Sequence, residues 1–162
     1  MPGQVEVELF VMSFCPYGVE AEKQLIPILR EFSNKVDFKL RFIANEVDDG
    51  PRPFEASHGV AELEENIRQA VIAAHAPDKL FDYLLCRAKH LKGSWEKCAL
   101  EVSIDAAEIQ RLVDRPETEA LFRENIRRGH ELKVYGSPTL YVDGRQFSRA
   151  LFTKSAKNVC GL

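Results

Sequence analysis

The chain has 162 residues, of which 45% are hydrophobic and 29% are charged, and its formal net charge is −3. This composition is typical of a globular protein with a hydrophobic core, and it argues against a disordered chain or a membrane-spanning protein. Nothing in the slightly acidic charge balance indicates nucleic-acid binding. We therefore expect one domain, residues 1–162, without a nucleic-acid or membrane partner.

The start of the sequence leads directly into a strand-like run after residues 1–4. A secretory signal needs a basic region, an apolar region and a small-residue cleavage site in series, and this pattern is missing here. A sequence without this signal is expected both for a cytoplasmic protein and for the mature form of an exported one. Four cysteines are too few for a disulfide scaffold but enough for one structural bridge and reactive thiols, so the redox compartment stays open.

The first part of the chain alternates between strand and helix patterns. Residues 5–12 alternate at first and then become continuously apolar, which is typical of a strand in a sheet covered on both faces. Residues 19–32 place apolar side chains on one face at helical spacing, and residues 36–43 alternate again. This order predicts a βαβ unit.

The middle of the chain reads as a loop followed by helices. Residues 45–57 are acidic and contain prolines, which indicates a loop. A helical tract at about residues 60–128 follows, in which Asp105 is the expected N-cap of one helix and Pro116 the first turn of the last. We expect Gly129 to end that helix.

The end of the chain returns to a strand pattern. Thr139–Val142 and Arg145–Phe147 flank Asp143 and Gly144, a pair typical of a hairpin turn. Residues 153–160 should form a short closing helix. The order βαβ, helical insertion, ββα predicts a split α/β domain.

Cys15 is the first candidate reactive group, because it stands between a predicted buried strand and a predicted helix in the run FCPYG at residues 14–18. Unpaired N–H groups and the helix dipole favour negative charge there, so we expect a lowered pKa of this thiol and a nucleophilic thiolate. Pro16 suits the first helical turn, and Tyr17 can shield the thiol on one side. The residues alone equally allow an inert, buried Cys15.

Pro138 is the second candidate, in the run GSPT at residues 136–139 directly before an apolar strand. A proline that opens a strand can follow a cis or a trans peptide bond. A cis-proline here would mark a tight turn. One motif places Cys15 between a strand and a helix, and the other places Pro138 before a strand and a hairpin. The two motifs together indicate a particular fold more specifically than either motif alone.

Together, FCPYG and GSPT resemble the thioredoxin superfamily, and the long helical insertion resembles its DsbA-like branch. The middle of the chain is also similar to the gamma-interferon-inducible lysosomal thiol reductase group, through residues 57–59 and the pair Cys86 and Cys98. The resemblance implies an α/β thioredoxin-like fold, a thiol–disulfide oxidoreductase activity on protein or peptide disulfides, and Cys15 as the nucleophile. It also implies a substrate groove lined by Pro16, Tyr17, Gly18, Ser137 and Pro138, in which Pro138 is a cis-proline.

Gly18 is a departure from the family, whose dithiol pattern has a second cysteine at this place. Without a neighbouring thiol, the mixed disulfide on Cys15 must be resolved from elsewhere. We predict a monothiol site that forms a stable adduct with glutathione, a co-substrate rather than a bound cofactor. We further predict that Gly18→Cys installs a dithiol, and that Cys160 lies in the closing helix, away from Cys15.

Cys86 and Cys98 lie on neighbouring predicted helices, with Gly93 between them. We favour a structural disulfide between them over two free buried thiols. With His90, the two cysteines leave a tetrahedral zinc site incomplete, so we expect no metal.

The remaining titratable candidates have no predicted role beside Cys15. We expect His58, His75 and His130 on the surface or on helix faces. Glu20 and Glu22, near the start of the first helix, are expected to be exposed charges that complement its dipole.

Three functions compete on this sequence. The first is a monothiol thiol–disulfide oxidoreductase acting through Cys15. The second is a glutathione transferase or isomerase of the kappa type, whose members typically carry serine at the place of Cys15. The third is a redox-inactive thioredoxin-fold module that binds an extended peptide along Pro138.

Overall fold

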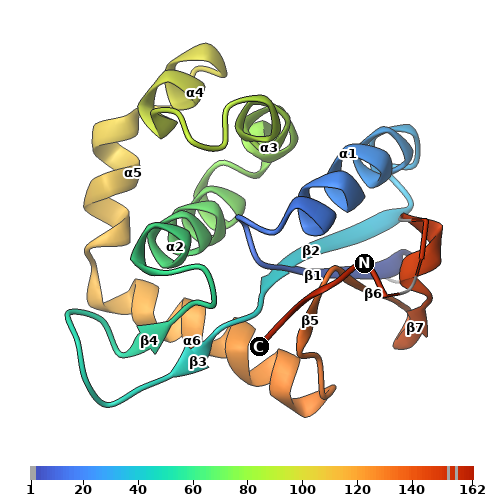
Figure 1. Ribbon diagram of the computed structural model, residues 1–162. Helices are drawn as coiled ribbons and strands as arrows, with labels where there is room; N and C mark the ends of the chain where they lie inside the picture. Colours follow the sequence, from blue (N-terminus) through green and yellow to red (C-terminus); the bar gives the residue numbers. More distant parts are fainter. Residues whose placement is uncertain (1–2, 153, 156) are drawn as a thin grey trace.

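A four-stranded sheet forms the centre of the computed structural model, which describes residues 3–152, 154–155 and 157–162. The strand order is β2-β1-β6-β7, with β1 parallel to β2 and antiparallel to β6 (Figure 1). These strands are β1 (Val5–Val11), β2 (Val36–Phe42), β6 (Thr139–Val142) and β7 (Arg145–Phe147). The predicted βαβ unit and the hairpin are therefore confirmed, with α1 (Pro16–Glu31) between β1 and β2.

β1 is central and is covered on both faces, as its apolar run predicts. One face carries Leu9 and Val11 and packs into the main core, which includes Leu25 and Ile26 of α1. The other face carries Phe10, which belongs to a second core cluster with Cys15 and Tyr141. Cys15, which follows the end of β1 in the chain, therefore packs in the second of these clusters.

The helical insertion lies between β2 and β6 in the chain. Its helices are α2 (Val60–His75), η1 (Pro77–Lys79), α3 (Leu80–Lys89), α4 (Trp95–Glu101), α5 (Ala106–Val113) and α6 (Pro116–Glu131). It follows a small hairpin of β3 (Asn45–Glu46) and β4 (Phe54–Glu55). Figure 1 shows α1 and α6 on opposite sides of the sheet. None of the helices in the described residues combines the length and apolar composition needed to cross a bilayer.

The predicted signals at the helix ends are mostly confirmed. Asp105 accepts a hydrogen bond from the backbone N–H of Glu108 as the N-cap of α5, and Pro116 opens α6. Gly129 does not end α6, which continues to Glu131. The turn instead uses Lys133 in the left-handed region (φ 56°), and Val134 N–H donates to the Gly129 carbonyl at 2.8 Å. This arrangement closes the helix without needing glycine.

The predicted closing helix is wrong where the structure describes it. Thr153 and Ala156, which fall within that prediction, lie outside the described residues. Cys160 belongs to a short strand, β8 (Cys160–Gly161), which follows η2 (Arg149–Leu151) and pairs with β5 (Gly136–Ser137). The end of the chain is therefore held by backbone pairing next to Pro138 rather than by helix packing on the sheet.

Candidate active site

Cys15 is the N-cap residue of α1 and has extended backbone geometry (φ −76°, ψ 118°). Its N–H donates to the Met12 carbonyl at 3.0 Å, and its carbonyl accepts from Val19 N–H at 3.0 Å. Pro16 takes the first helical position, where no N–H is needed. This local structure fixes Cys15 at the end of β1, where its side chain is fully buried (0% exposed).

Ser137 and Pro138 reach Cys15 because β1 and β6 are antiparallel partners. Phe10 pairs with Thr139, so the end of β1 and the start of β6 lie at the same edge of the sheet. The Ser137–Pro138 peptide bond is cis, as predicted. The Ser137 carbonyl oxygen lies 3.5 Å from Cys15 Sγ, and Ser137 Oγ accepts a hydrogen bond from Met12 N–H at 2.9 Å.

Cys160 is bonded to Cys15 in a disulfide with a Cα–Cα distance of 6.0 Å. β8 runs antiparallel to β5 and places Cys160 opposite Ser137. The prediction that Cys160 lies away from the first helix is therefore wrong. The physical reason is that backbone pairing along β5, which leaves no periodic pattern in the sequence, brings the end of the chain back over the site. The site is thus a pair of cysteines from opposite ends of the chain.

Gly18 leaves room for the side chain of Ser137. A Cβ added at position 18 would lie 2.6 Å from Ser137 Oγ and 3.4 Å from the Met12 carbonyl oxygen. The predicted Gly18→Cys dithiol therefore has no space for its side chain unless Ser137 moves. In this protein the side chain of Ser137 occupies the space next to position 18.

Tyr17 follows Cys15 in α1, and Arg149 contacts the turn at Pro138. Tyr17 is 36% exposed and lines an open hollow of about 530 Å³ together with Leu151 and Asn158. Arg149 Nε donates to the Pro138 carbonyl at 2.7 Å, and its Nη2 lies 3.1 Å from Thr139 Oγ1. Arg149 therefore holds both sides of the proline turn, a role for which the sequence offered no signal.

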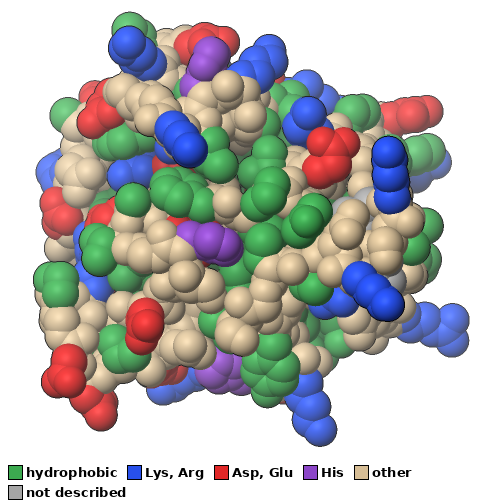
Figure 2. Space-filling view, viewed as in Figure 1, with side chains coloured by type: hydrophobic (Ala, Val, Ile, Leu, Met, Phe, Trp, Pro, Cys, Tyr) green, Lys and Arg blue, Asp and Glu red, His purple; other side chains and the backbone are tan. Residues whose placement is uncertain are grey.

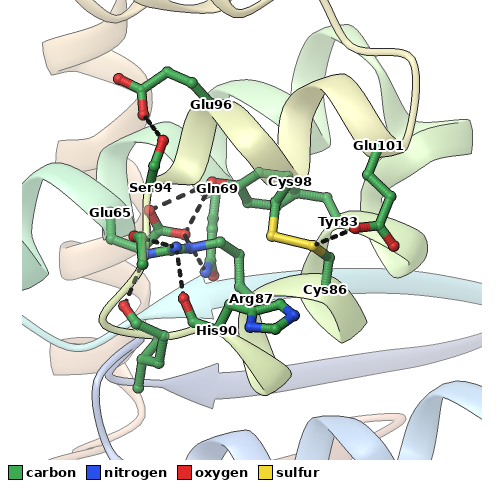
Figure 3. Close-up of a disulfide and its surroundings, with 12 residues drawn as sticks. Glu65, Gln69, Tyr83, Cys86, Arg87, His90, Ser94, Glu96, Cys98 and Glu101 are labelled. Carbon is green, nitrogen blue, oxygen red and sulfur yellow. Dashed lines mark hydrogen bonds and ion pairs between the residues drawn. A yellow bond between two sulfur atoms is a disulfide. The ribbon is translucent and has the colours of Figure 1, made fainter.

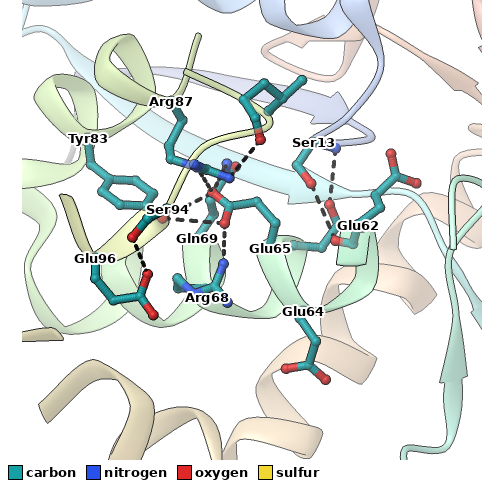
Figure 4. A network of polar contacts seen from close by, with 12 residues as sticks. Ser13, Glu62, Glu64, Glu65, Arg68, Gln69, Tyr83, Arg87, Ser94 and Glu96 are labelled. Atoms are coloured by element: carbon teal, nitrogen blue, oxygen red, sulfur yellow. Dashed lines mark hydrogen bonds and ion pairs between the residues drawn. The ribbon is translucent and has the colours of Figure 1, made fainter. Parts of the chain in front are cut away.

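The start of α2 holds the loop that leads into Cys15. Phe14 N–H donates to Glu62 Oε2 at 3.0 Å, and Ser13 N–H donates to Asn66 Oδ1 at 3.0 Å. Figure 4 shows Ser13 directed at the α2 segment that carries Glu62. His58 Nδ1 lies 2.7 Å from Glu62 Oε2, so His58 touches this support although the sequence did not place it near Cys15. The fully buried Glu62 is the residue that links them.

Glu22 corrects a second expectation, because it is buried rather than exposed. Burial, and secondarily the nearby charge of Glu65, raise the pKa of Glu22 to about 8. Glu65 forms ion pairs with Arg68 and Arg87 and accepts a hydrogen bond from Tyr83 at 3.1 Å (Figure 4). α1 therefore carries Cys15 at its start and the buried carboxyl group of Glu22 further along the helix.

The Cys86–Cys98 disulfide is present, as predicted, and joins α3 to α4 with a Cα–Cα distance of 5.7 Å. Figure 3 shows Arg87 beside it, between Glu65 and the turn that follows α3. Arg87 donates to the carbonyls of His90 and Gly93 at 3.1 and 3.0 Å. This bridge lies within a network of buried polar contacts that Cys15 and Cys160 do not share.

Two family models match the sequence, and each covers more than half of the chain. The model for gamma interferon inducible lysosomal thiol reductase (GILT) matches residues 6–102. The model for the DSBA-like thioredoxin domain matches residues 60–155. A search of curated proteins gave no significant match.

Solved structures share the fold at low sequence identity. A Nitrosomonas europaea protein assigned as a protein disulfide isomerase has a TM-score of 0.67 at 12% identity and covers 89% of this chain and 88% of its own. A thioredoxin-like oxidoreductase from Silicibacter pomeroyi gives 0.62 at 20% identity, with coverages of 89% and 77%. The oxidoreductase NmDsbA1 from N. meningitidis gives 0.62 at 18% identity, with coverages of 90% and 74%.

Of the three functions that the sequence allowed, the family matches support the first in its general form. The chain therefore belongs to the gamma interferon inducible lysosomal thiol reductase family and carries a DSBA-like thioredoxin domain, which makes it a thiol–disulfide oxidoreductase acting on protein thiols or disulfides.

Proposed function

We propose that Cys15 and Cys160 are the redox couple of this oxidoreductase, in place of the monothiol site predicted from Gly18. The observation that carries the proposal is the disulfide between them, beside Pro138. Their Cα atoms are 6.0 Å apart, within the range in which two cysteines bridge without moving the backbone. Cys160 is then the resolving thiol that FCPYG lacks.

The reaction follows from thiolate attack on sulfur. In the reduced protein the Cys15 thiolate attacks one sulfur of a substrate disulfide, forms a mixed disulfide and releases the other sulfur as a thiolate. The Cys160 thiolate then attacks Cys15 Sγ, forms the Cys15–Cys160 bond and releases the second substrate thiolate. The substrate disulfide gains two electrons, and the protein dithiol loses them.

The assignment of roles follows from position. Cys15 is fixed by the start of α1 and by the bonds of Met12 and Val19, whereas Cys160 lies in the two-residue strand β8, which pairs with β5. In this proposal Cys15 is the fixed nucleophile, and Cys160 moves aside so that a substrate can approach between the two attacks.

Protein substrates and glutathione complete the proposed cycle. Hydrophobic side chains gather in the middle of the face shown in Figure 2, over the starts of α1 and α2 seen in Figure 1. Tyr17 and Val60, at those two helix starts, are 36% and 68% exposed, which suits contact with a partly unfolded chain. Two molecules of glutathione can return the bridged form to the dithiol, leaving as glutathione disulfide.

Mass spectrometry of two single variants tests the couple. Reduced wild-type protein and Cys160→Ser are each treated with glutathione disulfide and followed by intact mass and peptide mapping. We expect the wild type to lose glutathione and end with a Cys15–Cys160 bridge, and Cys160→Ser to keep one glutathione on Cys15. An adduct that persists equally in both proteins would contradict the resolving role of Cys160. Cys15→Ser, which should form no adduct at this site, is the control for attack elsewhere.

A further inference from the structure

The end of the chain lies on the backbone edge that precedes Pro138. Among the described strands, β5 pairs only with β8, and the register joins Gly136 to Gly161 and Ser137 to Cys160. Leu162 N–H extends this pairing by donating to the Tyr135 carbonyl at 3.0 Å. Figure 1 shows the C-terminal segment running alongside β5 to the end of the chain. Residues 158–162, here called the tail, therefore lie as an added strand.

Gly136 is the residue that lets the tail approach so closely. A Cβ added there would lie 2.6 Å from Val159 Cγ2 and 2.8 Å from Arg149 Nη2. Val159 therefore packs directly over the bare backbone of Gly136. By contrast, a Cβ added at Gly161 would meet nothing closer than the Tyr135 carbonyl oxygen at 3.9 Å. The edge thus selects the side chain before Cys160 and tolerates different residues after it.

Apart from its disulfide, the tail is held by its pairing with β5 and by the packing of the half-buried Val159 on Gly136. Gly161 and Leu162 are exposed, and β8 is only 2 residues long. On balance, a backbone hydrogen bond contributes no more than the conformational entropy that is lost when one residue is ordered. A tail held by this pairing alone is therefore at best marginally bound. The covalent bond to Cys15 adds a further restraint to this short pairing.

We propose that the tail is a built-in ligand of β5, released when the Cys15–Cys160 bond is reduced, and that the cleared edge binds an extended peptide with an apolar residue directly before its cysteine. The peptide would replace the tail in the same antiparallel register, with its cysteine opposite Ser137 and within reach of Cys15. This inference rests on the proposed redox couple. The oxidised protein is then closed to substrate and the reduced protein is open.

Hydrogen exchange measured by NMR tests the release of the tail in the full chain. In oxidised wild-type protein the amide of Leu162 should be protected by its bond to Tyr135. In Cys160→Ser that amide should exchange at least about tenfold faster, because local opening sets the exchange rate. Equal protection in the two proteins would show that the tail stays bound without the disulfide, and would overturn the release.

A peptide made from the tail sequence tests the binding preference. The probe carries Val-Cys-Gly in the order of residues 159–161, flanked by Asn and Leu, with its cysteine activated as a mixed disulfide with thionitrobenzoate. Cys15 attacks the peptide sulfur, forms the Cys15–peptide disulfide and releases coloured thionitrobenzoate. The matched control peptide exchanges the Val and Gly positions and keeps the composition. The protein is Cys160→Ser, after intact mass confirms that Cys86 and Cys98 are still bridged.

We expect the tail-order peptide to react several-fold to about tenfold faster than the swapped peptide, the range of a small apolar contact of ~1 kcal/mol. Gly136→Ala should remove that difference, because its Cβ takes the space of the valine, whereas Gly161→Ala should keep it. Equal rates for both peptides, with Cys15 still reacting with glutathione disulfide, would overturn this inference and leave the redox couple standing. A Cys15 that reacts with neither reagent would overturn both.

Discussion

The two disulfides of this protein bridge very different parts of the fold. Cys86 and Cys98 are 12 residues apart in the chain, lie on adjoining helices and are surrounded by the buried contacts of Arg87 and Glu65. Cys15 and Cys160 are 145 residues apart and join the start of α1 to a tail whose last two residues are exposed. A bridge whose two ends are both fixed stabilises a fold, whereas a bridge with one loosely held end can open without unfolding it. The contrast predicts a structural role for the first and a redox role for the second.

The largest expected difference between the two bridges is in the activity of variants that lack one or the other. Cys15→Ser is expected to abolish the reduction of a protein disulfide in an assay that supplies glutathione as the reductant, because the attacking sulfur is removed. The double variant Cys86→Ala with Cys98→Ala should keep that activity at temperatures where it is folded. The measurement is the rate of substrate thiol release. A double variant that is folded by circular dichroism and yet as inactive as Cys15→Ser would contradict the division of roles.

Stability should separate them in the opposite sense. Loss of the Cys86–Cys98 bridge should lower the free energy of unfolding by about 3 kcal/mol in the chain-entropy model. The same model gives ~5 kcal/mol for a loop as long as that of Cys15–Cys160. We expect Cys160→Ser to lose clearly less than this, because the freed tail gains disorder in the folded state as well. Urea unfolding of the non-reduced proteins measures both values.

A Cys160→Ser protein that loses the full ~5 kcal/mol would indicate a tail that stays ordered when unbridged. Such a result would make both bridges structural. The comparison would then rest on activity alone.

A side chain added at Gly18, next to the redox bridge, should lower stability by less than the loss of either disulfide does in the chain-entropy model. Gly18→Ala places a Cβ 2.6 Å from Ser137 Oγ, so we expect a loss of roughly 1–3 kcal/mol of stability, as for overpacking elsewhere. Ser137→Ala removes the clashing oxygen but also the acceptor for Met12 N–H. The double variant should therefore lose less stability than the sum of the losses in the two single variants. A double-mutant cycle in urea measures this difference. Strict additivity would show that the two side chains do not compete for this space.

The sequence was sufficient for the elements that carry a regular pattern. The apolar run of β1 and the helical spacing of α1 are local signals, and they position Cys15 between the two elements. The pairing of Phe10 with Thr139 then brings Pro138 to it, as the family motifs indicate. The Cys86–Cys98 bridge could be predicted for the same reason, since both cysteines lie on short neighbouring helices.

The sequence was insufficient where backbone pairing or buried polar contacts decide the structure. β8 pairs with β5 over 2 residues, too short for any period, so Cys160 was assigned to a helix. The position of Glu22 in the helix does carry a signal of burial. The residue stands four positions before Ile26 and seven before Leu29, on the buried face of α1. Charge alone suggested exposure, and the helical position indicated the opposite.

Glu22 connects the two regions and gives the last and most gradual effect. It lies on the helix that starts at Cys15, and it faces the charge of Glu65, which belongs to the network around the Cys86–Cys98 bridge. Burial raises the pKa of Glu22 from 4.5 to about 8 in the folded protein. Between these two values the folded state keeps a proton that the unfolded state releases, so stability falls as the pH rises.

The slope contributed by Glu22 is on the order of 1 kcal/mol per pH unit within that window and vanishes on either side of it. Glu22→Gln, which keeps the shape of the protonated side chain, should flatten the dependence of the free energy of unfolding on pH between about 4.5 and 8. Glu20→Gln, a change of an exposed side chain on the same helix, is the matched control and should leave the slope in place. Urea unfolding at a series of pH values gives both slopes. If Glu22→Gln and wild type fell in parallel across the window, Glu22 would be ionised in the folded protein, and the buried carboxyl would not couple the first helix to the network beneath it.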